Sequence, residues 1–254
     1  MQGDACWSRR QDRLRVGREG SVSIARFRIT PLAAALGFAT LLQPLDEAHA
    51  ELLVSQLVVE LSPGEHRRSD VEIVNSGPEQ VFVSVEPREI IAAGTSAESA
   101  RTDPDPEKLG LLVSPARMVL EAGQRRLLRI ASIESSSRER IYRVTVKPVV
   151  GQLQSEASGL KVLVGYDMLV IVRPPDPKPH VSAARSGERL ILTNDGNVSV
   201  ELEGGKACDA AMKICKDLPG GRLYTGAQKA IRIAADRRVS YELKVGSKIV
   251  PIQF

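Results

Sequence analysis

Short stretches of alternating apolar residues, separated by turn sequences, follow one another through most of the chain after residue 50. Residues 53–61 end at Ser62-Pro63-Gly64, and residues 71–74 end at Asn75-Ser76-Gly77-Pro78. In residues 81–85 every second residue is valine. A period of two places alternate side chains on opposite faces of a strand, and no long stretch has the period of a helix. The sequence therefore predicts an all-β protein.

Further candidate strands continue this pattern at spacings of about 8–12 residues, the spacing of β-sandwiches. They are residues 111–113, 118–120, 127–130, 141–149 and 160–172. Turn sequences around Gly123 and around Ser136 separate three of them. Many short strands with frequent turns predict a sandwich of two packed sheets.

A proline-rich run, Arg173-Pro174-Pro175-Asp176-Pro177-Lys178-Pro179, divides the predicted strands into two groups. Prolines fix φ and cannot donate into a sheet, so this run indicates a semi-rigid connector. Beyond it, residues 190–202 repeat the earlier order of strand, Asn-x-Gly turn and strand. We therefore predict two β-sandwich domains in tandem, over residues 51–173 and 174–254.

The first fifty residues are typical of a secretory signal peptide. Arg26 and Arg28 precede an apolar stretch over residues 31–45, and Ala48-His49-Ala50 is a small-x-small triplet. The stretch is short for a membrane span, which needs about 20 residues. The alternative is a buried N-terminal helix. We predict a signal peptide over residues 1–50, cleaved near Ala50, and export without stable insertion in the membrane.

Two cysteines, Cys208 and Cys215, remain after removal of this segment. An even number of cysteines in an exported protein favours a disulfide over free thiols. Their spacing, with no histidine nearby, is poor for zinc, which takes four ligands. We predict a local, structural disulfide that closes a hairpin or loop.

Motifs of common enzymes are missing from the sequence: there is no G-x-S-x-G, H-E-x-x-H, P-loop or G-x-G-x-x-G. His66 and His180 lie in a polar stretch and after the connector, which favours surface positions. Asp103, Asp105 and Glu107 lack the glycine and terminal glutamate of a calcium-binding EF-hand loop. We therefore predict a protein without catalytic activity, cofactor or metal.

Charge and aromatic content exclude two further classes of function. The formal net charge is only +4 and aromatic residues make up 4% of the chain. A nucleic-acid-binding protein normally has a concentrated basic face with stacking aromatic residues. Carbohydrate-binding surfaces likewise need aromatic rings. We expect no nucleic-acid partner, and a β-sandwich hydrolase or carbohydrate-binding protein is disfavoured.

The stretch over residues 159–174 (GLKVLVGYDMLVIVRP) is long, apolar and β-branched, with Leu160, Val162 and Val164 on one face. It has two explanations. Either it is a central strand buried on both faces, which composition alone favours, or part of it is exposed. An exposed apolar strand can pair with a strand of a partner protein, binding through its backbone and selecting through alternate side chains.

A series of motifs runs in a characteristic order through residues 51–254: Leu112-Val113-Ser114-Pro115, Gly123-Gln124, Leu128-Arg129-Ile130, Glu139-Arg140-Ile141-Tyr142, Arg173-Pro174, Leu192-Thr193-Asn194 and Leu218-Pro219-Gly220-Gly221. This order resembles the periplasmic pilus (fimbrial) chaperones of the chaperone–usher pathway. The first-domain motifs are fairly specific and the second-domain motifs are looser.

The resemblance implies two immunoglobulin-like domains and a periplasmic protein that acts without a cofactor. Such chaperones lend a strand to a pilus subunit that lacks one, and deliver the subunit to an outer-membrane usher. The open groove of the subunit would otherwise expose apolar surface and unpaired edges. Carried over, the lent strand covers residues 160–168, and Leu160, Val162, Val164 and Tyr166 are its subunit-binding residues.

One departure from the family concerns the anchor for the C-terminal carboxylate of the subunit. Familiar members use an arginine in the first strand and a lysine near the end of the lent strand. By motif matching these positions hold Gln56 and Leu169, a neutral pair that cannot form a charge-assisted hydrogen bond. Arg173 and Lys147 are the nearest cationic candidates, and the departure indicates a divergent branch.

A second function is compatible with the same sandwiches, namely a structural or adhesive module of the cell surface. It predicts a self-sufficient protein with no bound pilus component. The sequence also leaves open whether the free protein associates with itself to cover the lent strand.

Overall fold

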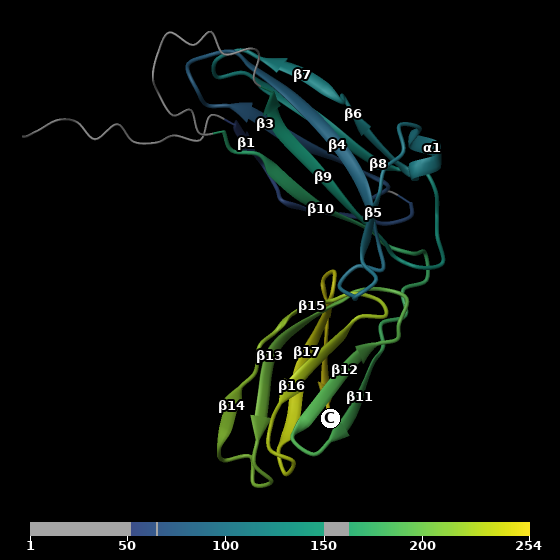
Figure 1. The fold of residues 1–254 in the computed structure, drawn as a ribbon, viewed down its shortest axis with the longest axis vertical. Helices are drawn as coiled ribbons and strands as arrows, with labels where there is room; N and C mark the ends of the chain where they lie inside the picture. Colours follow the sequence, from purple (N-terminus) through teal and green to yellow (C-terminus); the bar gives the residue numbers. More distant parts are fainter. Residues whose placement is uncertain (1–51, 65, 150–162) are drawn as a thin grey trace, which may run out of the picture. The chain divides into compact units, whose positions relative to one another are not determined.

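The computed structural model describes residues 52–64, 66–149 and 163–254 (Figure 1). The predicted signal peptide and the residues Leu160 and Val162 lie outside these ranges. Within them, no helix is long and apolar enough to cross a membrane.

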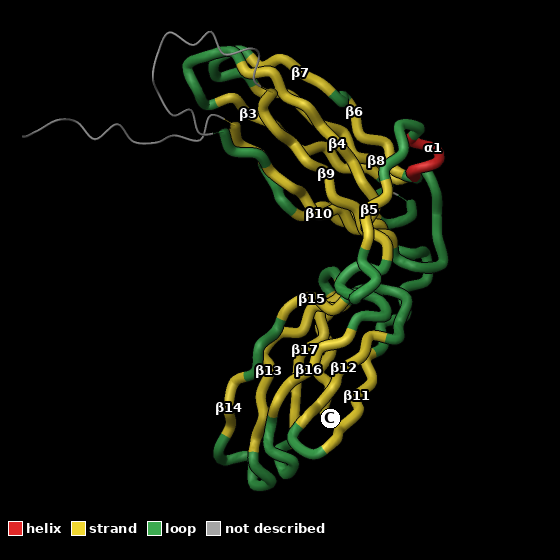
Figure 2. The backbone as a smooth tube through the Cα atoms, viewed as in Figure 1, coloured by secondary structure: helices red, strands yellow, loops and turns green. Residues whose placement is uncertain are grey.

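The residues before the connector form two sheets. One has the order β1 (Leu52–Val54), β3 (Arg68–Asn75), β8 (Arg125–Ser132), β6 (Leu111–Ser114). The other has the order β2 (Val58–Leu61), β10 (Tyr166–Val172), β9 (Arg140–Val149), β4 (Val81–Ile91), β5 (Ser99–Arg101), with β7 (Arg117–Leu120) also paired to β4. The short helix α1 (Pro106–Leu109) is drawn in red in Figure 2.

The core of this first sandwich follows the predicted period of two. Val81, Val83 and Val85 of β4 are buried, whereas Phe82 between them is 52% exposed. Buried side chains from both sheets form one continuous cluster. It contains, among others, Leu61, Val71, Ile73, Leu120, Leu128, Ile130, Tyr142, Val144, Met168 and Val170.

The residues after the connector form a second pair of sheets with a cluster of their own. One sheet has the order β11 (Val181–Ser186), β12 (Arg189–Asn194), β16 (Gln228–Arg232). The other has the order β14 (Cys215–Asp217), β13 (Val200–Cys208), β17 (Arg238–Val245), β18 (Lys248–Gln253), with β15 (Gly221–Leu223) also on β13. Leu192, Leu202 and Tyr241 lie at the centre of their core. The prediction of an all-β protein with two sandwiches is confirmed.

The Asn-x-Gly repeat has the same structural role in both sandwiches. Asn75 and Asn194 are fully buried. Each side-chain oxygen accepts a hydrogen bond from the glycine N–H two residues later, at 3.0 Å. Each Nδ2 donates to the carbonyl four residues later and to a carbonyl of a distant strand end, Leu120 or Leu223. The side-chain amide therefore supplies backbone partners that the turn itself cannot, which explains why asparagine stands at both positions.

Cys208 and Cys215 form the predicted disulfide. They are directly opposite one another in the antiparallel pair of β13 and β14. The disulfide closes a hairpin, as expected from the short spacing.

Candidate functional site

The first half of β10 has an open edge. β2 pairs with β10 in parallel, but only from Leu169 to Val172, where Leu169 lies opposite Val58. Upstream of Leu169, β10 pairs with β9 alone within the described residues. One side of this strand therefore has no neighbouring strand in that part of the chain.

Backbone groups of β10 point toward this open side. The N–H of Leu169 donates to the Leu57 carbonyl at 2.9 Å, and the N–H of Arg173 donates to the Leu61 carbonyl at 2.8 Å. Because backbone direction alternates with a period of two, the N–H of Asp167 points to the same side, beyond the reach of β2. An extended segment of another protein can pair with such an edge.

The side chains of the predicted subunit-binding strand differ in their surroundings. Leu160 and Val162 lie outside the described residues. Val164, just before β10, is 43% exposed. The Tyr166 ring packs against the first core, and its hydroxyl donates to the Leu52 carbonyl at 2.7 Å. The rest of β10, from Met168 to Val172, is buried. The stretch therefore has an exposed part at Val164 and a buried part in β10.

Gln56 and Leu169, the two positions that match the family's basic pair, are not neighbours across strands. Gln56 donates its side-chain N–H to Ser69 Oγ at 3.1 Å, and the sheet register places Val58 opposite Leu169. Motif matching did not show this because β1 ends at Val54 and β2 begins at Val58, in the other sheet. The segment between β1 and β2 crosses from one sheet to the other, so the register of β1 cannot be extended to β2.

A pair of arginines lies one strand away from Leu169. Arg143 of β9 is its cross-strand neighbour, and Arg88 of β4 is the neighbour of Arg143 in the next pair. Arg88 Nη2 lies 2.8 Å from Asp167 Oδ2, and Arg143 Nε lies 4.0 Å from the same oxygen. Both arginine side chains are about one-third exposed. Two cations thus share one carboxylate, which leaves a net positive charge beside the open edge.

Sequence reasoning missed this pair. Arg143 lies at an alternate, outward position in the stretch Arg140-Ile141-Tyr142-Arg143-Val144-Thr145-Val146. That alternation was visible in the sequence, but the register that places Arg143 beside Leu169 was not.

Arg173, one predicted anchor, is enclosed by protein groups. Its side chain is 6% exposed, and its Nη1 donates to Glu139 Oε2 and to the Ser199 carbonyl. Nη2 lies 3.1 Å from Glu60 Oε1. These contacts favour a structural role for Arg173.

Lys147, the other predicted anchor, is about half exposed and lies 2.9 Å from the Glu86 carboxylate. The hydrogen bond from Lys147 lowers the pKa of Glu86. Lys147 also lines an open groove of about 820 Å³ together with exposed apolar side chains, among them Phe82, Val119 and Val149. It is accessible to a partner, unlike Arg173.

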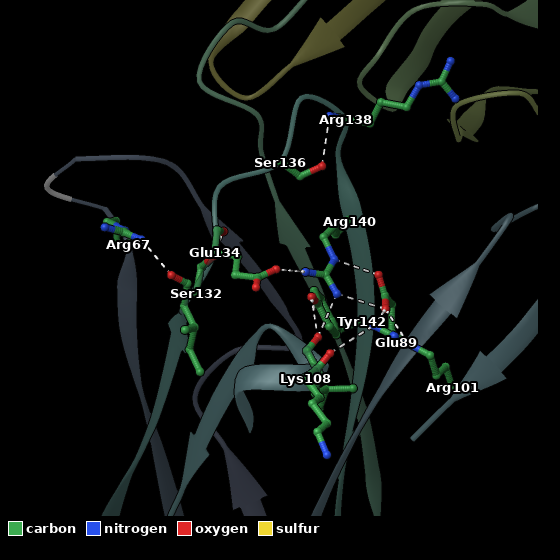
Figure 3. Close-up of polar contacts among 12 residues, drawn as sticks. Arg67, Glu89, Arg101, Lys108, Ser132, Glu134, Ser136, Arg138, Arg140 and Tyr142 are labelled. Atoms are coloured by element: carbon green, nitrogen blue, oxygen red, sulfur yellow. Dashed lines mark hydrogen bonds and ion pairs between the residues drawn. The ribbon is translucent and has the colours of Figure 1, made fainter. Parts of the chain in front are cut away.

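A polar network holds β9, which carries Arg143, in position (Figure 3). The Glu89 carboxylate, 8% exposed, accepts from Arg140 Nε at 2.8 Å and from Arg101 Nη2 at 2.5 Å. Arg140 Nη2 and the Tyr142 hydroxyl both donate to the Leu109 carbonyl, at 2.8 and 3.1 Å. Burial raises the pKa of Tyr142, so its hydroxyl stays a donor. The network joins β9 to β4, β5 and the end of α1.

The acidic loop considered for calcium has other contacts. Asp103 accepts from the N–H of Asp105, and Asp105 accepts from the N–H of Glu107 as the N-cap of α1. His180 is exposed and contacts Asp195. The described residues contain no group of three or more histidine, cysteine or acidic side chains that could hold a metal.

Comparison with known proteins gives a family match. The family model for "Pili and flagellar-assembly chaperone, PapD N-terminal domain" matches residues 51–178. Two curated Escherichia coli relatives are similar over part of the chain. The B subunit of CS1 fimbriae is 26% identical over 146 residues, which cover 54% of this chain. The A subunit of CFA/I fimbriae is 24% identical over 159 residues, which cover 59% of it. The alignments span 61% and 66% of these two relatives.

Solved structures share the fold over a longer range. The class 5 fimbriae chaperone CfaA superimposes with a TM-score of 0.67 at 19% identity, covering 80% of this chain and 97% of CfaA. The SafB chaperone, solved with the SafA pilin of Salmonella enterica, gives a TM-score of 0.53 at 17% identity, covering 82% of this chain and 97% of the matched chain. At these identities the likeness concerns the fold, two immunoglobulin-like sandwiches.

Proposed function

Because the chain belongs to the family of pili and flagellar-assembly chaperones, we propose that it binds pilus subunits by strand donation and delivers them to an outer-membrane usher. The observation that carries this proposal is the open edge of β10 upstream of Leu169, with exposed Val164 beside it. Binding is stoichiometric and uses no cofactor. No catalytic step is part of it.

In this mechanism the segment over residues 160–168 pairs with the edge of an incomplete subunit. Leu160, Val162 and Val164 alternate with a period of two, so they would enter the groove of the subunit from one face. Tyr166 is already packed against the chaperone core. The chaperone therefore holds the Tyr166 ring, and only the backbone of this part of the segment is open for pairing.

We propose that Arg143, supported by Arg88, binds the C-terminal carboxylate of the subunit. Arg143 is the cationic side chain next to Leu169 in the sheet, and Asp167 balances only one of the two positive charges. A carboxylate there would form charge-assisted hydrogen bonds. Lys147 is the second candidate because its side chain is exposed. Arg173 is the third, because its guanidinium group already forms ion pairs with Glu139 and Glu60.

The family is periplasmic. We propose that residues 1–50 direct export and are removed near Ala50. The disulfide between Cys208 and Cys215 agrees with an oxidising compartment.

Purification from its own periplasm tests the proposed function. The C-terminally tagged protein is expected to elute with a stoichiometric companion of small, β-rich pilin type, detected by intact mass. The same spectrum gives the mature N-terminus, expected at Glu51. A protein that elutes alone or only as self-oligomers would favour the surface-module alternative.

Substitution of the proposed anchor is expected to weaken subunit binding. Arg143→Gln removes the charge and keeps much of the side-chain volume, and we expect the Kd for a purified pilin to rise by about 10- to 100-fold. Lys147→Gln and Arg173→Gln are the matched comparisons, measured by the same titration. Equal binding by Arg143→Gln and the unmodified protein would contradict the assignment of the anchor.

A further inference from the structure

The turn between β13 and β14, residues 209–214, presents two apolar side chains to solvent. We call this segment the hairpin tip. Ile214 is 66% exposed, more than any other large apolar side chain in the described ranges, and Met212 is 52% exposed.

The hairpin tip is held in one shape without a partner. The disulfide between Cys208 and Cys215 closes its base. Asp209 Oδ1 accepts from the N–H of Lys213 at 2.7 Å and from the N–H of Ile214 at 3.2 Å. Met212 has a φ of +58°, a conformation that costs free energy for a residue other than glycine. The fold thus maintains a strained turn that displays two apolar side chains, and such strain often marks a functional position.

The turn between β16 and β17 forms a hydrogen bond with the hairpin tip. Arg237, in the turn between β16 and β17, donates from Nη1 to the Ile214 carbonyl at 2.7 Å. Arg185 of β11 donates to the carbonyls of Ala235 and Arg237, both at 3.0 Å. Figure 1 shows the two turns at the same end of the second sandwich. These hydrogen bonds join the two turns to one another and to β11.

Basic residues outnumber acidic residues on and beside the two turns. The cations on or beside the two turns are Arg185, Lys213, Lys216, Arg237 and Arg238, and the acidic residues there are Asp209, Asp217 and Asp236. One oxygen of Asp209 is occupied by the two backbone N–H groups of the turn. The two turns therefore carry more positive than negative charge beside the two exposed apolar side chains.

We propose that the hairpin tip docks on the surface of an anionic phospholipid bilayer. Met212 and Ile214 enter the headgroup region, and the cations on and beside the two turns contact the lipid phosphates. Reversible attachment to such a surface requires only a small apolar area together with positive charge. A protein interface normally buries about 800 Å² on each partner, far more than two side chains on a narrow turn supply. The proposal rests on the tip and is independent of strand donation.

Vesicle sedimentation tests this proposal with the full mature protein. Vesicles of phosphatidylglycerol and phosphatidylcholine are expected to sediment the protein, and vesicles of phosphatidylcholine alone are not. The double substitution M212S/I214S is expected to lower the partition coefficient by about tenfold or more, because the buried apolar contacts are lost. K213Q/K216Q is expected to lower it as well, and added salt should weaken binding by the unmodified protein.

The control is I249S/V250S, which removes two apolar side chains of similar exposure from β18 of the same sandwich. It is expected to sediment like the unmodified protein. Thermal unfolding of each variant shows whether the fold is kept. The proposal is wrong if anionic vesicles do not sediment the protein, or if M212S/I214S leaves sedimentation unchanged. If the protein does not bind vesicles, but M212S/I214S weakens its binding to a purified usher, the hairpin tip recognises a protein. That result would also overturn the proposal.

Discussion

Val164→Asp is expected to abolish the complex with a pilus subunit. The substitution removes an apolar contact worth about 1–3 kcal/mol and places a charge in an apolar groove, where it finds no partner. A combined loss of about 3 kcal/mol or more raises the Kd by over a hundredfold. Val164 is 43% exposed in the free protein, so the chaperone itself should remain folded. Co-purification and titration with the subunit measure the effect.

The matched control is Leu127→Asp, an equivalent change at a 58% exposed position on β8, in the other sheet. It is expected to leave subunit binding unchanged. Val162→Asp, in the part of the lent strand outside the described residues, is expected to behave like Val164→Asp. An intact complex with both aspartate variants on the lent strand would refute strand donation by residues 160–168.

Glu89→Gln is expected to destabilise the first sandwich by about 3 kcal/mol. The neutral side chain leaves Arg140, whose side chain is 16% exposed, without its counter-charge in the network of Figure 3. Breaking a buried pair by removing one partner costs more than the pair contributes, because a charge remains desolvated. Chemical denaturation followed by circular dichroism measures the change. Glu86→Gln, which breaks the exposed pair with Lys147, is the control and is expected to change stability by less than about 1 kcal/mol.

The same network makes stability depend on pH. Burial acts to raise the pKa of Glu89, but the hydrogen bonds and charges of Arg140 and Arg101 outweigh it and lower the pKa below its usual 4.5. A carboxyl whose pKa is lower in the folded state stabilises the fold above its unfolded value and loses that contribution as pH falls. The unmodified protein should therefore lose stability below about pH 4.5 more steeply than Glu89→Gln. Parallel slopes for the two proteins would remove Glu89 from this explanation.

The fold could be predicted from the sequence because the strand periodicity and the turn motifs indicate the same structure. The valines at 81, 83 and 85 show the inward face of β4 directly, and the Asn-x-Gly turns mark strand ends in both halves. The disulfide followed from two cysteines close in sequence. Each of these features depends on residues near one another in the chain, where period and turn chemistry decide the structure.

The site was less accessible because it depends on register between distant strands. The neighbour of Leu169 is Val58 on one side and Arg143 on the other, and no local pattern reveals either pairing. Motif matching gave Gln56 and Leu169 only as the positions of the family's basic pair, and it could not show that β1 and β2 lie in different sheets. Arg173 looked like a free cation in the sequence, although Glu60 and Glu139, both far away in the chain, enclose it.

The parallel pairing of β2 with β10 also has a consequence for the order in which the first sandwich assembles. Val58 pairs with Leu169, and more than a hundred residues, roughly 110, separate the two partners along the chain. Contacts of such long range raise the contact order of a domain and slow its folding. A chain that enters its compartment from the N-terminus exposes β2 long before β10 arrives. The sandwich is thus completed late, by the same strand whose upstream part we propose to pair with the pilus subunit.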